Sequence, residues 1–149
     1  MTKEVVLQLI DAHSWQDAMH LTVRPEQQRF VADHSPIAAV GLAKAYVRPG
    51  GKVWLPYGIF AGSTMVGFFM LTFPEKGNDD AWLFHFFIDQ RYQGRGYGIQ
   101  SMLKLIEIAP KVHPEGSGLC LVVHPENEAA QRLYERMGFR STGELKWNE

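Results

Sequence analysis

Three glycines at positions 94, 96 and 98 are the residues of this sequence whose spacing most directly indicates chemistry. They follow an apolar and aromatic stretch, 82–89, and precede an apolar run at helical spacing, so the segment is predicted to form a strand, a tight turn and a helix. Glycine has no Cβ, so the backbone can adopt positive φ and approach a ligand closely. The first-turn N–H groups of the helix would point at that ligand, with the positive end of the helix dipole behind them. The segment therefore predicts an anion-binding site, and a pyrophosphate is the expected ligand.

The spacing of these glycines argues against two common nucleotide-binding loops. A dinucleotide-binding turn has the pattern GxGxxG and an acidic residue about twenty positions later, whereas this sequence has GxGxG. A nucleotide-hydrolysing loop needs a Lys followed by Ser or Thr, and that pair is absent here. Because a glycine-rich turn before a helix also occurs as an ordinary connection, the prediction needs a second motif.

Two motifs together resemble the GCN5-related N-acetyltransferase (GNAT) family. Residues 91–96 have the pattern R-x-x-G-x-G, similar to the coenzyme A pyrophosphate loop of that family, and residues 127–139 follow its N-x-x-A-x-x-x-Y-x-x-x-G-F pattern. Within the family, the stretches FFID, RYQGRGYG and GEL most resemble bacterial spermine/spermidine (diamine) N-acetyltransferases. The resemblance implies an α/β (α+β) GNAT fold, with a mixed, mostly antiparallel central sheet that is splayed between strands 4 and 5 and flanked by helices.

The resemblance also assigns residues to acetyl-CoA, the expected co-substrate. The backbone of Phe86, Phe87 and Ile88 would run beside the pantetheine arm, where a splay or bulge would free an N–H for the thioester oxygen. Asn127 would bond the pantetheine arm or cap the following helix, and both readings are open. Tyr134 would contact the coenzyme and, as general acid, hand its phenolic proton to the departing sulfur; simple packing on a helix flank is the alternative. The residues expected at the pyrophosphate are Gln93, Gly94, Arg95, Gly96, Tyr97, Gly98 and Ile99.

The general base is the point where this sequence departs from the family pattern. Polyamine acetyltransferases commonly carry an acidic residue just before the aromatic pair of the fourth strand, and this sequence has Phe84 and His85 there. Phe84 cannot accept a proton, whereas histidine ordinarily titrates near neutral pH, so His85 is the candidate base. Strand alternation puts 84 and 86 on one face and 85 and 87 on the other, which leaves a packed or surface His85 open as an alternative. His124 is a second candidate.

An acidic loop precedes the fourth strand and could hold the cationic tail of a polyamine. Glu75 and Asp80, with Asp79 between them, are the acidic candidates, and Trp82 and Tyr57 would add cation–π contacts. A solvated turn rich in charge and glycine is the alternative. The expected partner is a small-molecule amine, and a polyamine is the expected class.

Length, charge and cysteine content argue against several other classes of protein. The 149-residue length fits one domain, 1–149. The net charge of −1 lacks the basic footprint of a nucleic-acid-binding protein. No apolar run approaches the roughly 20 residues of a bilayer span, and the start MTKEVV is unlike a signal peptide, so a cytoplasmic location without membrane association is expected. Cys120, the only cysteine, is expected to be a buried structural thiol, and neither a disulfide nor a metal site is predicted.

Other segments predict the elements that position these residues. Strands are expected over 4–10, over 53–61 and 65–73 as a hairpin, over 119–123 as a strand buried on both faces, and from Phe139 toward Leu145. Helices are expected after Ser14, in capping-box register with Asp17, and from Pro36 at a first helical position up to 48–51. A helix after the glycines should end before Pro110, and one that starts at Asn127 should stop at Gly138.

The expected function is therefore transfer of acetyl from acetyl-CoA to a primary amine of spermidine or spermine. Another acceptor, such as a protein N-terminus, a small amino compound or an aminoglycoside, is one alternative. A non-catalytic coenzyme A-binding sensor is another, since the acidic residue before His85 is missing. No obvious seventh strand follows the sixth, so that edge is either open or covered by another subunit, and a homodimer is one expectation.

Overall fold

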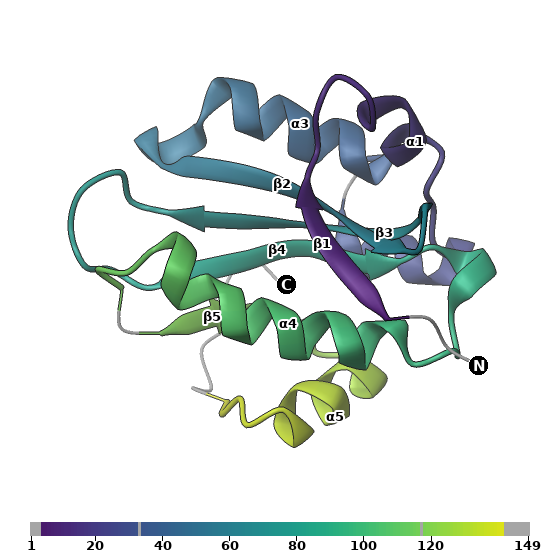
Figure 1. Ribbon diagram of the computed structural model, residues 1–149. Coiled ribbons are helices and arrows are strands. Elements are labelled where there is room, and N and C mark those ends of the chain that lie inside the picture. Colours follow the sequence, from purple (N-terminus) through teal and green to yellow (C-terminus); the bar gives the residue numbers. More distant parts are fainter. Residues whose placement is uncertain (1–3, 33, 117, 142–149) are drawn as a thin grey trace.

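The fold is a five-stranded sheet with helices on both faces, as seen in the computed structural model (Figure 1). The structure describes residues 4–32, 34–116 and 118–141. The strands lie in chain order across the sheet, and their bounds are β1 Val5–Leu9, β2 Val53–Ala61, β3 Thr64–Phe73, β4 Ala81–Ile88 and β5 Leu119–Leu121. The first four pair antiparallel, and β5 pairs parallel to β4. The expected α/β class and mostly antiparallel sheet are therefore confirmed.

Each face of the sheet has its own buried cluster. One cluster joins the sheet to α4 (Tyr97–Val112) and includes Phe69, Met102 and Leu105. The other joins it to α1 (Trp15–Met19) and α3 (Ile37–Val47) and includes Phe68 and Ile37. The α5 helix (Glu128–Arg136) packs on the α4 face, as Figure 1 shows. The remaining helical segments are α2 (Gln28–Val31) and the 3₁₀ turns η1 (Pro25–Gln27), η2 (Pro49–Gly51) and η3 (Gln90–Tyr92).

The predicted hairpin, the start of α1 after Ser14 and α5 are confirmed, whereas one capping interaction and two helix boundaries differ from prediction. The capping box of Ser14 with Asp17 is wrong, because Ser14 makes no side-chain cap bond and its hydroxyl pairs with Asp11. Pro36 is the N-cap of α3 and not its first helical residue. The end expected before Pro110 is also wrong: α4 continues to Val112, because the buried face of this helix outweighs the single bond that proline removes.

The β5 strand is shorter and less buried than predicted. It pairs with β4 through Leu119, Cys120 and Leu121 only, and all three are half-buried, because the described part of the sheet has no strand on the far side of β5. The expectation of a strand buried on both faces, and of a buried Cys120 thiol, is therefore wrong. The last predicted strand, from Phe139 toward Leu145, lies largely outside the described residues.

Two irregularities in β4 shape the centre of the fold. Its register with β5 covers only the first three residues and ends at Leu83, so in the described residues the second half of β4 diverges from β5. Opposite β3, Phe68 pairs with Phe87 and Met70 with Phe84, which leaves one extra residue on β4. That β-bulge includes His85, whose φ of 56° lies in the left-handed region. The expected splay and bulge therefore occur in the same stretch.

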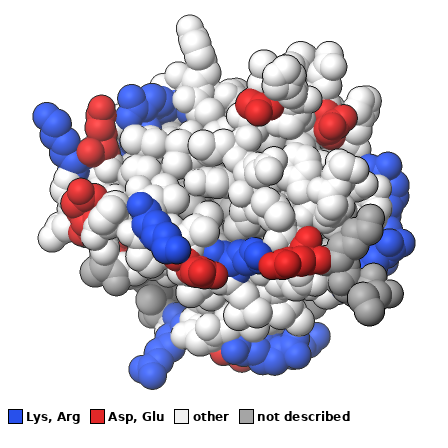
Figure 2. All heavy atoms as spheres, viewed as in Figure 1, with Lys and Arg blue, Asp and Glu red and all other residues white. Residues whose placement is uncertain are grey.

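Among the described residues, no helix is long and apolar enough to cross a bilayer. On the face seen in Figure 2, Lys and Arg side chains lie beside Asp and Glu, with no continuous basic area on the part that is described.

Candidate active site

The glycine turn between β4 and α4 has the bent backbone that its sequence predicts. Gly94 has φ 79° and Gly96, the N-cap of α4, has φ 83°, both in the left-handed region that favours glycine. Gly98 lies inside α4 without positive φ, so the expectation that all three glycines bend the chain is wrong for this one. Its missing side chain keeps the wall of the adjoining pocket open.

The buried carboxylate of Asp89 anchors the start of this turn. It is fully buried, and it accepts from the Thr22 N–H at 2.9 Å, the Arg91 N–H at 2.9 Å and Arg91 Nε at 2.8 Å. Burial on its own raises the pKa of Asp89, but the hydrogen bonds from Arg91 and Thr22 outweigh it and hold the pKa below the ordinary value. Sequence reasoning missed this residue, although an acid at the end of an apolar strand is a detectable signal.

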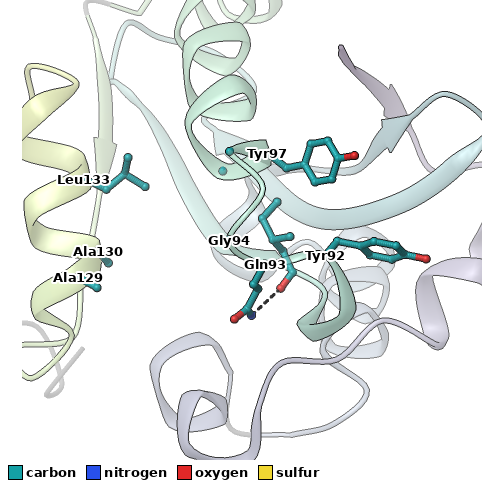
Figure 3. Close-up of a pocket in the computed structure, with 10 residues that line it drawn as sticks. Tyr92, Gln93, Gly94, Tyr97, Ala129, Ala130 and Leu133 are labelled. Carbon is teal, nitrogen blue, oxygen red and sulfur yellow. Dashed lines mark hydrogen bonds between the residues drawn. The ribbon is translucent and has the colours of Figure 1, made fainter. Parts of the chain in front are cut away.

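Gln93 fastens the other side of the turn. Its Nε2 donates to the Ile88 carbonyl at 2.9 Å, a bond drawn in Figure 3, and it pairs with the side chain of Gln27 at 2.9 Å. Because the amide of Gln93 is engaged with the protein, its structural role is to hold the turn against β4 and η1. Its expected contact with the coenzyme stays a prediction.

A pocket of about 340 Å³ lies between the glycine turn and α5. Figure 3 shows the turn on one side and the small side chains of Ala129 and Ala130, with Leu133, facing it from α5. The other lining residues are Ile88, Tyr92, Gln93, Gly94, Gly96, Tyr97 and Gly98. The pocket thus joins the two sequence motifs, which are about thirty positions apart in the chain, a separation that only the fold closes.

The charges and dipoles at this pocket suit a pyrophosphate. The first intrahelical bond of α4 runs from Gln100 N to Gly96 O, so the N–H groups of 97–99 precede the helical ladder at its positive end. Arg91 and Arg95 are exposed, and their guanidinium carbons lie 5.2 and 5.6 Å from the Tyr92 ring. An open pocket, oriented N–H donors and two nearby cations therefore fit the diphosphate of coenzyme A.

Tyr134 lies on α5, one position beyond the pocket wall. It is half-buried against the α4-side cluster, with its ring 5.9 Å from and edge-on to Phe139. Burial raises the pKa of the Tyr134 hydroxyl to about 12, which keeps the phenol protonated at neutral pH. Asn127 accepts from the Ala130 N–H at 3.3 Å and so caps α5, which is one of its two expected roles.

The β4 residues expected beside the pantetheine arm follow the bulge. Phe86 packs toward α4, whereas Phe87 is buried on the opposite face. Phe87 and Ile88 pair with β3, and their other edge faces the divergence from β5. The placement is compatible with an extended arm between the strands.

The bulge turns His85 toward α2 and α3. Its Nδ1–H donates to the Val31 carbonyl at 2.8 Å, since a carbonyl can only accept, and its Nε2 lies 2.8 Å from Lys44 Nζ and accepts from it. The simple alternation expected for 84–87 is wrong, because the extra residue puts Phe84, His85 and Phe87 on the same side. Val31 and Lys44, the partners of His85, were missed.

His124 lies elsewhere, in the connection that leads to α5. Its Nδ1 accepts from the Glu126 N–H at 3.1 Å, and its ring lies 5.0 Å from Phe30 of α2. Arg29 of α2 reaches the same connection through an ion pair of 2.9 Å with Glu126. Together with the Gln27–Gln93 pair and the Val31–His85 bond, these contacts make α2 and η1 a bridge between β4 and the β5–α5 connection.

The predicted substrate residues are not brought to one place. Glu75 pairs with Arg48 at 3.4 Å near the end of α3, whereas Asp80 accepts from the Cys120 thiol at 3.4 Å beside β5. Tyr57 is buried and stacked on Phe69 in the α4-side cluster, away from solvent. Trp82 stacks on Phe84 with ring centroids 6.4 Å apart, on the α3 side. In the described residues no group of three or more His, Cys, Asp or Glu could hold a metal ion.

Comparison with known proteins agrees with this arrangement. The acetyltransferase (GNAT) family pattern matches residues 11–139. The spermine/spermidine N(1)-acetyltransferase of Bacillus subtilis (strain 168) is 38% identical over 62% of this chain, and the match spans 64% of the length of that relative. The spermidine N-acetyltransferase of Vibrio cholerae, solved in complex with CoA and spermine, aligns with a TM-score of 0.74 at 14% identity over 95% of this chain and 84% of that one. An acetyltransferase of Thermus thermophilus aligns with a TM-score of 0.68 at 20% identity over 94% of this chain and 90% of that one.

The two solved structures establish the shared fold, and the family pattern spans both the glycine turn and α5. This chain belongs to the GNAT family of acetyltransferases.

Proposed function

We propose that this protein is an N-acetyltransferase that moves the acetyl group of acetyl-CoA to a primary amine of a polyamine such as spermidine or spermine. The observation that carries the proposal is the pocket between the α4 N-terminus and α5, where the first N–H groups of α4 suit a diphosphate and two arginines lie beside the lining residue Tyr92. The curated relative in Bacillus subtilis supports the polyamine as acceptor.

In the proposed reaction, acetyl-CoA supplies an acyl group activated as a thioester. The turn at 94–98 binds the diphosphate and so orients the thioester end along the second half of β4. A backbone N–H at the bulge donates to the thioester oxygen as negative charge develops there. Tyr134 donates its proton to the departing sulfur, and its raised pKa ensures that the proton is present at neutral pH.

The amine must lose a proton before it attacks, and His85 is the proposed acceptor. In the structure its Nε2 already accepts from Lys44, so His85 can take a proton from the substrate only after Lys44 has moved. His124 stays the second candidate. The proposed cytoplasmic location, the single domain and the homodimer stay predictions, and so do the substrate roles of Glu75 and Asp80.

The test is release of thiol from acetyl-CoA by the wild-type protein with spermidine, spermine, an aminoglycoside and an N-terminal peptide amine. We expect release that depends on spermidine or spermine, and a loss of at least about 100-fold in kcat for Tyr134→Phe, the usual size of a general-acid contribution. The Tyr134→Phe melting temperature should change little, because the ring packing is kept. Calorimetric binding of coenzyme A without turnover on any amine would instead identify a sensor, and turnover with another amine only would replace the acceptor.

A further inference from the structure

The ammonium group of Lys44 occupies an aromatic site on the α3 side of the sheet. Its Nζ lies 5.1 Å from the centroid of the Trp54 ring and 5.7 Å from that of Phe84. The same Nζ lies 2.8 Å from His85 Nε2. We call Trp54, Phe84 and His85 the Lys44 cage. One cation is therefore held by two ring faces and one nitrogen lone pair.

The orientation of His85 makes this lone pair available to a cation. Because Nδ1–H donates to the Val31 carbonyl at 2.8 Å, a neutral His85 must present Nε2 as an acceptor. Ring faces carry negative potential and attract ammonium groups, and such aromatic surroundings are used for binding ammonium ligands. The cage thus has the chemistry of a site for an alkylammonium, and the chain fills it with its own lysine.

The cage adjoins the proposed reaction centre and is accessible. His85 is at the β4 bulge and directly precedes Phe86, which is expected to lie beside the thioester arm. The cage residues and Lys44 are all half-buried, so none is sealed in the core. Lys44 is on the last turn of α3, and its side chain has four rotatable bonds on which it can swing out.

We propose that the Lys44 cage is an ammonium subsite for the amine substrate, and that Lys44 is a built-in competitor which the substrate displaces. This proposal rests on the proposed function, because it names the place where that substrate's cation binds. An incoming alkylammonium would replace Lys44 on the same two rings and at the same nitrogen. Lys44 thereby raises the concentration of amine needed to fill the site and discriminates against weakly bound cations.

The test measures binding of butylammonium and of spermidine by calorimetry in the absence of acetyl-CoA, so that turnover plays no part. Lys44→Met keeps the apolar stem and removes the cation, and Lys44→Gln keeps a polar end without charge. We expect both variants to bind with a Kd about five-fold lower than wild type, the gain from vacating cation–π contacts at a partly exposed site. Lys52→Met removes one exposed charge outside the cage and is the matched control, with an unchanged Kd expected.

The double variant Lys44→Met/Trp54→Leu should lose this gain, because one of the two ring faces is gone. Unchanged or weaker binding in both Lys44 variants, at wild-type melting temperature, would overturn the proposal. Retention of the gain in the double variant would overturn it as well.

Failure of this inference can be told apart from failure of the proposed function. If wild type acetylates spermidine and the Lys44 variants have unchanged Kd values, the ammonium subsite is refuted and the proposed acetyltransferase function stands. If the Lys44 variants bind the amines more tightly but no amine gives thiol release, the ammonium subsite stands and the proposed acetyltransferase function is refuted.

Discussion

Replacement of Asp89 by Asn tests whether its charge organises the coenzyme turn. The carboxylate is fully buried and uses both oxygens, Oδ2 for the Thr22 N–H and Oδ1 for two donors of Arg91. Asn offers one oxygen and one NH₂ group, so at least one of these N–H donors would face another donor. A hydrogen bond to a buried charged group contributes roughly 1.5–3 kcal/mol, and an orphaned donor has a similar cost. We expect Asp89→Asn to lower the free energy of unfolding by about 2–3 kcal/mol.

The pH dependence gives this prediction a second arm. The folded-state pKa of Asp89 is lowered, so its charged form contributes stability that is fully present above the ordinary carboxyl pKa of about 3.9. That contribution is lost as the pH falls through the lower folded-state pKa. The difference in free energy of unfolding between wild type and Asp89→Asn should therefore be constant between about pH 7 and pH 5 and should shrink below about pH 4.

The assay is urea unfolding of wild type, Asp89→Asn and Asp79→Asn at several pH values. Asp79 is exposed, and Asp79→Asn makes the same chemical change outside the buried network. The control should stay within about 0.5 kcal/mol of wild type. Equal stability of the two variants, or a difference that persists unchanged below about pH 3, would refute the reasoning.

Three further predictions concern the glycine turn, the α5 cap and the proposed acid. Gly96→Ala should lower the free energy of unfolding by about 1–2 kcal/mol, because φ at this position is 83°. Gly98→Ala should raise the free energy of unfolding by up to about 1 kcal/mol, because position 98 lies inside α4, and should weaken coenzyme A binding, because it lines the pocket. Thermal melts measure the two changes in stability, and calorimetry measures coenzyme A binding. Asn127→Ala should cost about 1 kcal/mol through loss of the α5 cap, and Asn127→Ser should restore most of it, as measured by urea unfolding. In the pH profile of kcat, Tyr134 should produce no loss of rate below about pH 11, since burial raises its pKa to about 12, and an alkaline limb near about pH 9 that Tyr134→Phe abolishes would contradict this assignment.

Local patterns were sufficient to predict much of the scaffold. The β2–β3 hairpin follows from two apolar and β-branched runs around a short turn, and α5 follows from a capping Asn and a terminal Gly. The glycine turn was recognisable because positive φ at Gly94 and Gly96 is a property of single residues. Each of these signals lies within about twenty neighbouring positions.

The contacts of His85 at the bulge could not be predicted from local sequence patterns. His85 is bonded to residues 54 and 41 positions away, Val31 and Lys44, and no spacing rule connects them. The extra residue in β4 also reverses the face on which the following side chains lie, so alternation fails there. Asp89 accepts a hydrogen bond from the N–H of Thr22, 67 positions away. These features arise from tertiary packing, and sequence patterns describe only the elements that are packed.

The short α2 helix depends on its contacts with neighbouring segments, so it should respond when a ligand binds. Four residues are too few to hold a helix in water on their own, so its single turn persists only while its outward contacts do. Those contacts reach His85 on β4 on one side and Glu126, in the connection between β5 and α5, on the other. A ligand that moves β4 away from the β5–α5 connection would strain these contacts. Amide hydrogen exchange at Ala32, whose N–H donates to the Gln28 carbonyl and closes the turn, would report that strain together with any shift of His85.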